Sequence, residues 1–389
     1  MFPISLLITA IIMASSFLKK NSIPNDKNGK YQPIVISSPS NGAKVNLLEG
    51  GIYEFAYDYV KFKSKDYLSS DYPAGYSPNG KQRADEYSPK PVTITWDSED
   101  GAEYYSIKVS TKKDLSKAES YVTFDKSLEL LDLFVDTTYY YQIIANFSNK
   151  EIKSQIFTFT TANLIRTIDI EGVSNTRDIG GRFTLGGSRI RQGMVYRGAR
   201  LDDITEKGKE KALKTYGIKT DLDLRAEKTE SPLGKGVNFV NVSGPYYVGF
   251  YGVDSILDGS NGIWQGTYRE ALIKEIKTFA ESKNYPIYVH CAIGRDRTGT
   301  IIFLINALCG VDEKDLYMDY ETSFFSTSGC LDGQTPQTMV GGPFTNLVDY
   351  MKNYGNGSLS QNVEKFMLDI GILKEEIDAI RSIMIEEIE

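Results

Sequence analysis

A short run between two apolar segments combines residue types that suit phosphate chemistry. The run "YVHCAIGRDRTGT" covers residues 288–300 and places His290, the chain's single histidine, directly before Cys291, one of three cysteines. A strand-like segment precedes the run and a helical pattern starts near Thr298, so the run is expected to be a loop at a helix N-terminus. Backbone N–H groups and the helix dipole favour an anion there. The same setting lowers the pKa of a thiol, which makes Cys291 a candidate thiolate nucleophile.

The residues that follow Cys291 support the same interpretation. Gly294 permits a backbone turn that a side chain would block, and Arg297 carries a planar guanidinium that can bind two oxygens of a phosphate. Singly, such residues are ordinarily structural, but their combination between a strand and a helix has little use outside phosphate chemistry. The residues expected to surround the phosphate are Ala292, Ile293, Gly294, Arg295, Asp296 and Arg297.

The run also resembles a known signature. "HCAIGRDRTG" resembles His-Cys-x5-Arg-Thr/Ser of the cysteine-dependent phosphatases, and more closely the loop of the bacterial secreted tyrosine and lipid phosphatases. Arg295 stands where that family usually has lysine, and Thr176 replaces its usual aromatic residue. Further segments resemble motifs of the family in the same order: "SNTRDIGG" (174–181), "GMVYRGARL" (193–201), "DLDLRAEKTE" (221–230) and "YMDYETSF" (317–324).

The resemblance implies a double displacement without a cofactor or a metal ion. Cys291 would attack phosphorus and form a phosphocysteine, while Arg297 and the loop N–H groups hold the charge of the transferring group. Thr298 would help the sulfur to leave, and His290 would hold the loop in shape. The phosphocysteine would then be hydrolysed by an activated water.

The general acid is open between two aspartates. The chain has no Trp-Pro-Asp loop. We favour Asp296, because the Asp-Arg pair resembles the loops of myotubularins and Sac-type phosphoinositide phosphatases. Asp223 is the alternative, although it could simply anchor Arg225. The segment 243–268 is aromatic and glycine-rich and is either a mobile lid or a packed loop. The family motifs and this segment together supply the residues expected to bind substrate, which are Arg177, Arg225 and Tyr247.

The elements that position this loop alternate between strands and helices. Helical patterns cover 203–217, 267–283, 345–355 and 361–388, and strand-like runs cover 218–224 and 285–290. Such alternation predicts an α/β fold with a mostly parallel central sheet flanked by helices. With the resemblance, residues 164–389 are expected to form a catalytic domain with the cysteine-phosphatase fold, able to act without the rest of the chain.

The preceding part of the chain predicts an all-β sandwich. Segments 91–97, 104–111, 138–147 and 154–162 are rich in β-branched and aromatic residues and are separated by turn signals. Their order resembles a fibronectin type III domain, which we assign to 31–162 with a polar insertion at 61–90. Residues 19–30 are expected to be a linker. The uncharged stretch before Lys19 predicts a signal peptide or an N-terminal anchor at 1–18, and therefore export to the outside of a bacterial cell or to its surface.

Charge and cysteine content limit the partners. The formal net charge of −7 argues against a general nucleic-acid binder. Three cysteines do not form a disulfide scaffold, and Cys309 and Cys330 are expected to be free rather than bridged. The expected function is an exported phosphatase acting on phosphotyrosine, with phosphoserine, phosphothreonine and phosphoinositides as further substrates. Two alternatives stay open: an inositol-polyphosphate or phosphoinositide phosphatase, or a surface protein that binds a cell-surface or host partner through the sandwich and carries an inert phosphatase module.

Overall fold

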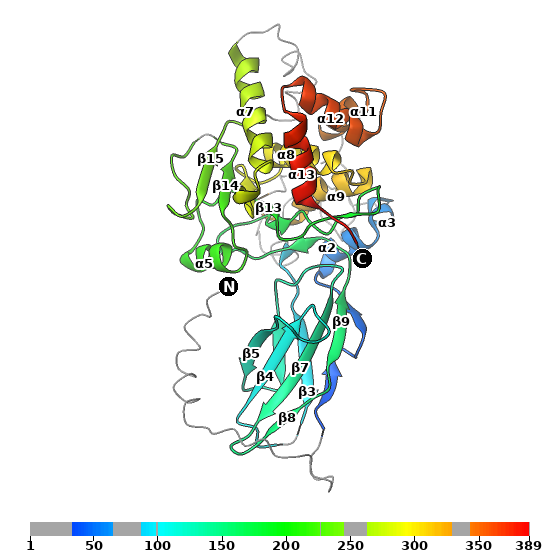
Figure 1. Ribbon diagram of the computed structural model, residues 1–389, viewed down its shortest axis with the longest axis vertical. Helices are drawn as coiled ribbons and strands as arrows, with labels where there is room; N and C mark the ends of the chain where they lie inside the picture. The colour runs from blue at the N-terminus through cyan, green and yellow to red at the C-terminus, as the bar shows by residue number, and fades with distance from the viewer. Residues whose placement is uncertain are drawn as a thin grey trace. The chain divides into compact units, whose positions relative to one another are not determined.

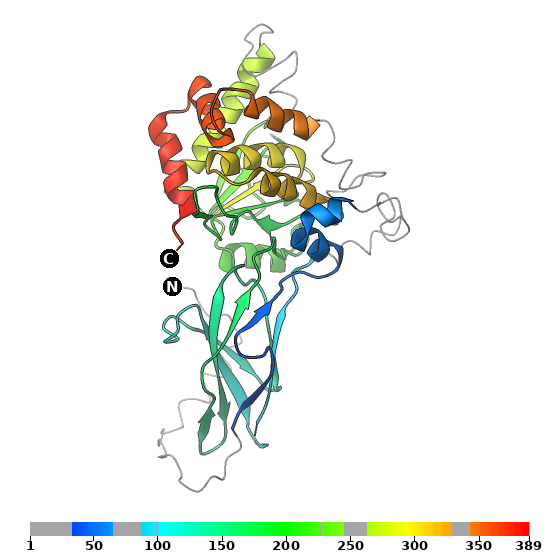
Figure 2. The same ribbon diagram turned by 90° about the vertical axis from the view of Figure 1, so that its right-hand side faces the viewer.

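The computed structural model describes residues 33–64, 87–98, 100–225, 227–244, 263–328 and 343–388 (Figures 1 and 2). The chain forms two compact units. The first unit consists of Met1–Val45, Pro91–Leu131 and Thr137–Ala162, and the second unit of Asn46–Lys90, Asp132–Asp136 and Asn163–Glu389. The chain therefore passes between the units several times before residue 163.

The first unit is built from two β-sheets. One sheet has the strand order β1-β3-β6 and the other β2-β9-β7-β4-β5, with β8 paired to β7. Trp96 of β3 and Tyr105 of β4 bring the two sheets together, with ring centroids 5.2 Å apart in an edge-on contact. The strands are β1 (Val35–Ser38), β2 (Ala43–Val45), β3 (Val92–Asp97), β4 (Tyr104–Ser110), β5 (Glu119–Thr123), β6 (Ser127–Leu130), β7 (Thr138–Asn146), β8 (Glu151–Lys153) and β9 (Phe157–Thr161).

The second unit is a mixed α/β structure around a six-stranded sheet with the order β10-β11-β13-β16-β14-β15. The four strands from β13 to β15 in this order are parallel, and β10 and β11 add antiparallel pairs at one edge. The strands are β10 (Arg166–Thr167), β11 (Arg177–Asp178), β13 (Val195–Gly198), β14 (Thr220–Asp223), β15 (Asn238–Asn241) and β16 (Ile287–His290), with a separate pair of β12 (Arg189–Ile190) and β17 (Ile385–Glu386).

Helices cover both faces of this sheet. The helix α5 lies on one side, and α7, α8 and α13 lie on the other (Figures 1 and 2). The later helices are α5 (Glu206–Lys214), α7 (Ile263–Phe279), α8 (Asp296–Leu308), α9 (Glu313–Thr322), α11 (Pro343–Lys352), α12 (Leu359–Asp369) and α13 (Lys374–Met384), with 3-10 turns at Ser282–Asn284 and Ser323–Phe325.

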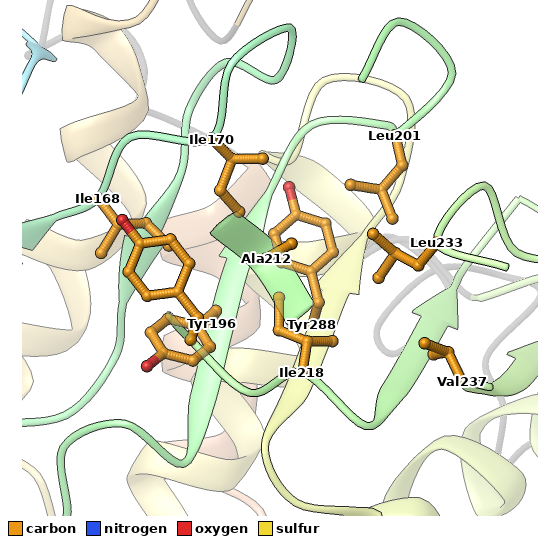
Figure 3. Packing of buried hydrophobic residues seen from close by; sticks show 10 residues of the cluster. Ile168, Ile170, Tyr196, Leu201, Ala212, Ile218, Leu233, Val237 and Tyr288 are labelled. Carbon is orange, nitrogen blue, oxygen red and sulfur yellow. The ribbon is translucent and has the colours of Figure 1, made fainter. Parts of the chain in front are cut away.

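Apolar side chains fix α5 on its face of the sheet (Figure 3). Ala212 of α5 packs in one buried cluster with Tyr196 of β13 and Tyr288 of β16. The remaining members of the cluster are Ile168, Ile170, Leu201, Tyr216, Ile218, Leu233 and Val237. Burial of this apolar surface is the main force that holds the helix on the sheet.

The parallel strands end in register at one edge of the sheet. Gly198 pairs with His290, and Asp223 pairs with both His290 and Asn241, so the last residues of β13, β16, β14 and β15 lie in a row. In open parallel sheets, ligands bind at this carboxyl edge. The loop at 291–295 begins there, directly after β16.

Two details differ from the ranges expected from the sequence. Asn46–Lys90 was expected within the sandwich but packs in the second unit, where it forms α2 (Gly50–Tyr57) and α3 (Tyr59–Ser64). The ring of Phe55 lies 5.2 Å from that of Phe325, and this apolar contact explains the difference. The helix expected over 361–388 is two helices, because Gly371 adopts φ +102° and ends the first.

Some expectations concern residues outside the described ranges. The signal peptide or anchor at 1–18, the linker at 19–30, Cys330 and Tyr247 all lie there. In the part of the chain that the structure describes, no helix combines the length and the apolar composition needed to span a bilayer.

Candidate active site

The loop after β16 is held in one conformation by close backbone contacts. Gly294 adopts φ +72°, and a Cβ atom placed on it would lie 2.2 Å from the carbonyl oxygen of Gly198. Gly198 is equally confined, because its own Cβ would lie 2.2 Å from the hydroxyl of Tyr288. Glycine is therefore required at both positions. The loop rests directly on the end of β13, and α8 begins at Asp296 immediately after it.

The carbonyl oxygens of the loop all have donors, and these donors come from surrounding segments. Ala292 O accepts from the N–H of Arg200 at 3.2 Å, Ile293 O from Asn175 Nδ2 at 2.9 Å, and Gly294 O from Arg197 Nη2 at 2.6 Å. Arg295 O accepts from the N–H of Gly299 at 2.7 Å. These bonds turn the carbonyls into the protein, so the loop N–H groups face the opposite way, as an anion-binding nest requires.

Cys291 lies at the start of this nest and is 4% exposed. Burial by itself would raise the pKa of its thiol, but hydrogen bonds from the Thr298 hydroxyl and from the N–H groups of Thr298 and Gly294 outweigh burial and lower the pKa. The Thr298 hydroxyl is buried, has no other hydrogen-bond partner in the described ranges, and acts on the Cys291 thiol in the direction that lowers its pKa. The structure therefore favours a thiolate at Cys291.

His290 supports the loop through contacts of both ring nitrogens. Its Nε2 lies 2.9 Å from Asp221 Oδ1, and its Nδ1 lies 3.2 Å from Cys291 O. Burial would lower the pKa of the imidazole, but the hydrogen bond and charge of Asp221, with the charge of Asp223, raise it instead. Asp221 is itself held by Ser231 Oγ at 2.6 Å. His290 is fully buried next to the loop.

The two arginines of the loop differ in their surroundings. Arg297 Nη1 donates to Leu224 O at 2.9 Å, which anchors one end of its guanidinium at the end of β14. Arg295 is 6% exposed, and its Nε donates to Asp296 Oδ1 at 2.9 Å. Tyr320 OH donates to the same oxygen at 2.9 Å. Asp296 Oδ1 thus has two donors, whereas Oδ2 has a longer contact of 3.4 Å with Arg295 Nη2.

Asp223 and the two other arginines expected to bind substrate are paired inside the protein. Asp223 holds Arg225 through both carboxylate oxygens, and Arg225 also binds Asp202 at 2.9 and 3.0 Å. Arg177 is 1% exposed and donates to Asp319 at 2.9 Å. The geometry gives Arg177 and Arg225 supporting positions rather than positions open to a substrate.

Several residues that contact the loop could not be identified from the motif at 288–300. Arg197 is fully buried and reaches both Gly294 O and the carboxylate of Asp319. Burial and the nearby Arg177 lower the pKa of Arg197 to about 10, although Asp319 opposes this effect. Asn175 donates to the loop from a left-handed conformation, φ +59°. The order of the motifs indicated these segments, but not which side chains contact the loop.

The structure therefore brings most of the expected catalytic residues to one edge of the sheet. Thr298 lowers the pKa of the Cys291 thiol, and the imidazole of His290 lies against the carbonyl oxygen of Cys291. Asp296 and Arg297 are the first two residues of α8, which follows the loop. Asp223 is near the imidazole, 3.9 Å from His290 Nδ1. In the described ranges, no group of three or more His, Cys, Asp or Glu side chains has an arrangement suited to a metal ion.

Comparisons with known proteins show which proteins this chain is similar to. A candidate tyrosine-protein phosphatase of Cupriavidus necator is 29% identical over 165 residues, which are 38% of this chain and 59% of that protein. The candidate tyrosine-protein phosphatase OCA1 of Saccharomyces cerevisiae is 29% identical over 90 residues, 23% of this chain and 37% of that protein. The chain thus spans less than two thirds of the length of either relative.

Among solved structures, the core catalytic domain of the PP-IP phosphatase SIW14 from S. cerevisiae, in complex with citrate, covers 40% of this chain and 89% of its own. The sequence identity is 16% and the TM-score is 0.24. The sequence profile of the tyrosine phosphatase family matches residues 168–386. Because that match covers more than half of the chain and contains the whole loop from Cys291 to Arg297, the chain belongs to the tyrosine phosphatase family.

Proposed function

We propose that the second unit hydrolyses phosphomonoesters through a phosphocysteine on Cys291. The observation that carries the proposal is the lowered pKa of a buried thiol inside a loop whose carbonyls all point away from it. A thiolate surrounded by N–H donors at a helix N-terminus suits attack on a bound phosphate dianion. Arg297, fixed at Leu224 O, is the side chain positioned to bind the phosphoryl oxygens.

In the first step, the Cys291 sulfur forms a bond to phosphorus as the bond from phosphorus to the leaving oxygen breaks. The leaving oxygen takes a proton from Asp296, which thereby becomes a carboxylate. Asp296 Oδ2 is the oxygen suited to carry that proton, because Oδ1 already accepts from Tyr320 and Arg295. Asp223 is less suited, since each of its oxygens accepts from Arg225 at 2.9 Å, whereas Asp296 Oδ2 has only the longer bond of 3.4 Å from Arg295 Nη2.

In the second step, the Asp296 carboxylate takes a proton from a water molecule, and the water oxygen attacks phosphorus. The bond between sulfur and phosphorus breaks, and inorganic phosphate leaves with the thiolate restored. The Thr298 hydroxyl, which lowers the pKa of the Cys291 thiol, donates to the departing sulfur. Both steps use groups that the loop and the first turn of α8 supply.

The substrate class that we propose is the phosphotyrosine side chain. Family membership favours an aryl phosphate. A phosphoinositide would need a further cation for its second phosphate, but Arg295, the other arginine of the loop, is 6% exposed and paired with Asp296. The structure therefore offers less support for a polyphosphorylated substrate than the sequence did.

The test of the proposal is whether Cys291→Ser loses phosphatase activity while it keeps its fold. A serine hydroxyl has no comparable ionised form at neutral pH, so turnover of an aryl phosphate should fall to background while the thermal midpoint stays within a few degrees. Cys309→Ser is the matched control, because burial raises the pKa of that thiol to about 12 and it lies at the far end of α8. Acid quench and mass spectrometry should find the phosphoryl group on Cys291. Full activity in Cys291→Ser, or trapped phosphate on another residue, would contradict the mechanism.

We also propose that the first unit is a fibronectin type III-like sandwich and that the protein is exported. The support is the strand order and the packing of Trp96 against Tyr105 for the former, and the apolar N-terminal stretch for the latter. Cell fractionation of the tagged full chain tests export. Accumulation of the full-length chain in the cytosol would contradict it.

A further inference from the structure

Glu275 in α7 is a buried carboxyl group that the proposed mechanism does not use. It is 1% exposed, and no donor in the described ranges reaches its Oε1. An ionised carboxylate without a partner is costly inside a protein, so such a group keeps its proton or stays close to a positive charge. Glu275 therefore needs an explanation beyond packing.

The carboxyl group lies next to the anchor of Arg297. Leu224 O accepts from Arg297 Nη1 at 2.9 Å and from the N–H of Gly244 at 3.1 Å. A Cβ atom placed on Gly244 would lie 2.8 Å from Glu275 Oε1 and 3.0 Å from Leu224 Cβ. Gly244 thus allows the Glu275 carboxyl to lie close to Leu224, whose carbonyl oxygen holds the Arg297 guanidinium.

Two opposing effects act on Glu275. Burial raises the pKa of its carboxyl well above the ordinary range, and the charge of Arg297 lowers it only in part. Among the charged groups on the described elements packed around it, Arg297 from α8 is the one whose field acts on Glu275. The adjacent Lys274 on α7 directs its amino group away, to Asn241 O at 3.3 Å. The free protein therefore favours the neutral acid at Glu275.

We propose that Glu275 is a proton-holding positioning residue that controls Arg297. With its proton, Glu275 does not compete for the positive charge of the guanidinium when the transferring phosphoryl group binds. Without the proton, its carboxylate competes with that group for the same positive charge. The inference rests on the proposed function, because it requires that Arg297 binds the phosphoryl oxygens.

This competition has a thermodynamic consequence. One guanidinium cannot fully compensate two anions, so an oxyanion in the nest favours the protonated form of Glu275. By linkage, binding then takes up a proton once the pH exceeds the pKa that Glu275 has in the free protein. The affinity for the oxyanion should decrease as the pH rises, by up to about tenfold per pH unit for one linked proton.

The experiment uses the full chain with Cys291→Ser, which removes the titration of the thiol. Sulfate is the probe, because it stays dianionic over the whole range from about pH 5.5 to 9, in which buried acids and histidines titrate. Isothermal titration calorimetry in two buffers of different ionisation enthalpy gives the affinity and the number of protons taken up. We expect proton uptake that increases with pH. Adding Glu275→Gln should remove that increase and leave sulfate binding nearly independent of pH.

The controls separate Glu275 from other buried acids and from misfolding. Glu321→Gln changes another fully buried glutamate, which accepts from Tyr59, and should leave the proton uptake intact. If Glu275→Gln does not fold, as judged by its thermal unfolding, Glu275→Met removes the same proton in an apolar side chain of similar length. Titration of His290 is present in every variant and cancels in the comparison.

The outcomes are distinct. Equal proton uptake with and without Glu275, or no uptake in the Cys291→Ser parent although it binds sulfate, would overturn the inference and leave the proposed function standing. A parent that binds no sulfate at any pH would contradict the proposed function, and the inference with it.

Discussion

Asp223 binds Arg225 through both of its carboxylate oxygens. Oδ1 accepts from Nε and Oδ2 from Nη2, each at 2.9 Å, and Oδ1 also accepts from the Arg225 N–H at 3.0 Å. Both side chains of this ion pair are less than 5% exposed. Both oxygens of Asp223 are therefore occupied by donors of one residue. This pairing favours Asp296 over Asp223 as the general acid.

Asp296→Asn should slow substrates with poor leaving groups far more than substrates with good ones. A phenolic or alkyl oxygen needs a proton in the transition state, whereas a nitrophenolate does not. We expect a loss of about 10²–10⁴-fold in kcat for the poor leaving group, the usual size of a general-acid contribution. The measurement is the slope of log kcat against the pKa of the leaving group for a series of aryl phosphates.

The matched variant is Asp223→Asn, which removes a carboxylate from the same edge of the sheet. It should lower the stability of the protein, because it loosens Arg225. It should also lower kcat by a similar factor for every leaving group. A steeper leaving-group dependence in Asp223→Asn than in Asp296→Asn would reverse the assignment.

The sequence predicted the catalytic loop better than its supports. Cys291, Arg297 and Thr298 are contiguous, and the strand and helix around them have clear patterns, so residue types and spacing were enough. Arg197 and Asn175 contact the same loop from segments about 100 residues earlier. Their roles depend on which backbone carbonyl each reaches, and that geometry exists only after the strands have paired.

The sequence likewise predicted the individual strands and helices better than the way in which they pack. The strands β3, β4, β7 and β9 lie within the four segments predicted from their β-branched and aromatic residues, and α5 lies within its predicted helix, whereas α8 begins two residues before the predicted start at Thr298. The placement of Asn46–Lys90 in the second unit was not predicted, because 46–60 was assigned to the sandwich and 61–90 to a polar insertion within it. Tertiary contacts such as that of Phe55 with Phe325 decide where the segment lies, and local sequence does not encode them.

Asp319→Asn should destabilise the protein strongly, although the residue does not reach the sulfur. Its carboxylate holds Arg177 and Arg197, which are almost fully buried. Removing one partner of a buried ion pair leaves the other charge uncompensated, so the free energy of unfolding should fall by about 3–5 kcal/mol. Urea unfolding measures the change. Asp203→Asn, in an exposed pair with Arg200, is the control and should change stability by about 0.5 kcal/mol or less.

The pH dependence of the Asp319 contribution has a defined sign. Burial would raise the pKa of its carboxyl, but the charges of Arg197 and Arg177 outweigh burial and lower it. The stabilisation is therefore present above the pKa of an unfolded aspartate, about 3.9, and is lost as the pH falls through the lower folded value. If Asp319→Asn lost equal stability at pH 7 and below that folded pKa, the carboxylate would not be the source of the effect.

His290 should titrate above the ordinary histidine pKa of about 6.5. The cause is Asp221, whose hydrogen bond and charge outweigh the effect of burial. Because the folded pKa is raised, the stabilisation is fully present below the unfolded pKa and is lost as the pH rises through the folded one. As the chain's single histidine, His290 gives one unambiguous imidazole signal in NMR. Asp221→Asn should shift its pKa downward; an unchanged pKa would contradict the assignment.

Residues before 160 contribute directly to the unit that carries the active site. Arg166 donates to Leu133 O at 3.0 Å and to Asp132 O at 2.7 Å, and Tyr216 OH donates to the Asp132 side chain at 2.5 Å. Gln192 forms two hydrogen bonds with the backbone of Val135, at 2.8 and 2.9 Å. All of these residues belong to the second unit. The segment Asp132–Asp136 is thus part of the structure around the catalytic sheet.

A chain that begins at residue 160 should therefore be less stable than expected for an independent catalytic domain, although it retains Cys291 and Arg297. The shortened chain leaves the Arg166 guanidinium without its two carbonyl acceptors and removes Phe55 and Tyr87, which contact Phe325 and Arg177. Each unpaired buried polar group costs about 1–3 kcal/mol, so we expect a thermal midpoint at least several degrees below that of the full chain. Gln192→Ala in the full chain tests the argument at one contact and should lower stability while leaving kcat unchanged. A shortened chain that matches the full chain in thermal midpoint and in kcat/KM would show that Asp132–Asp136 and Asn46–Lys90 are dispensable.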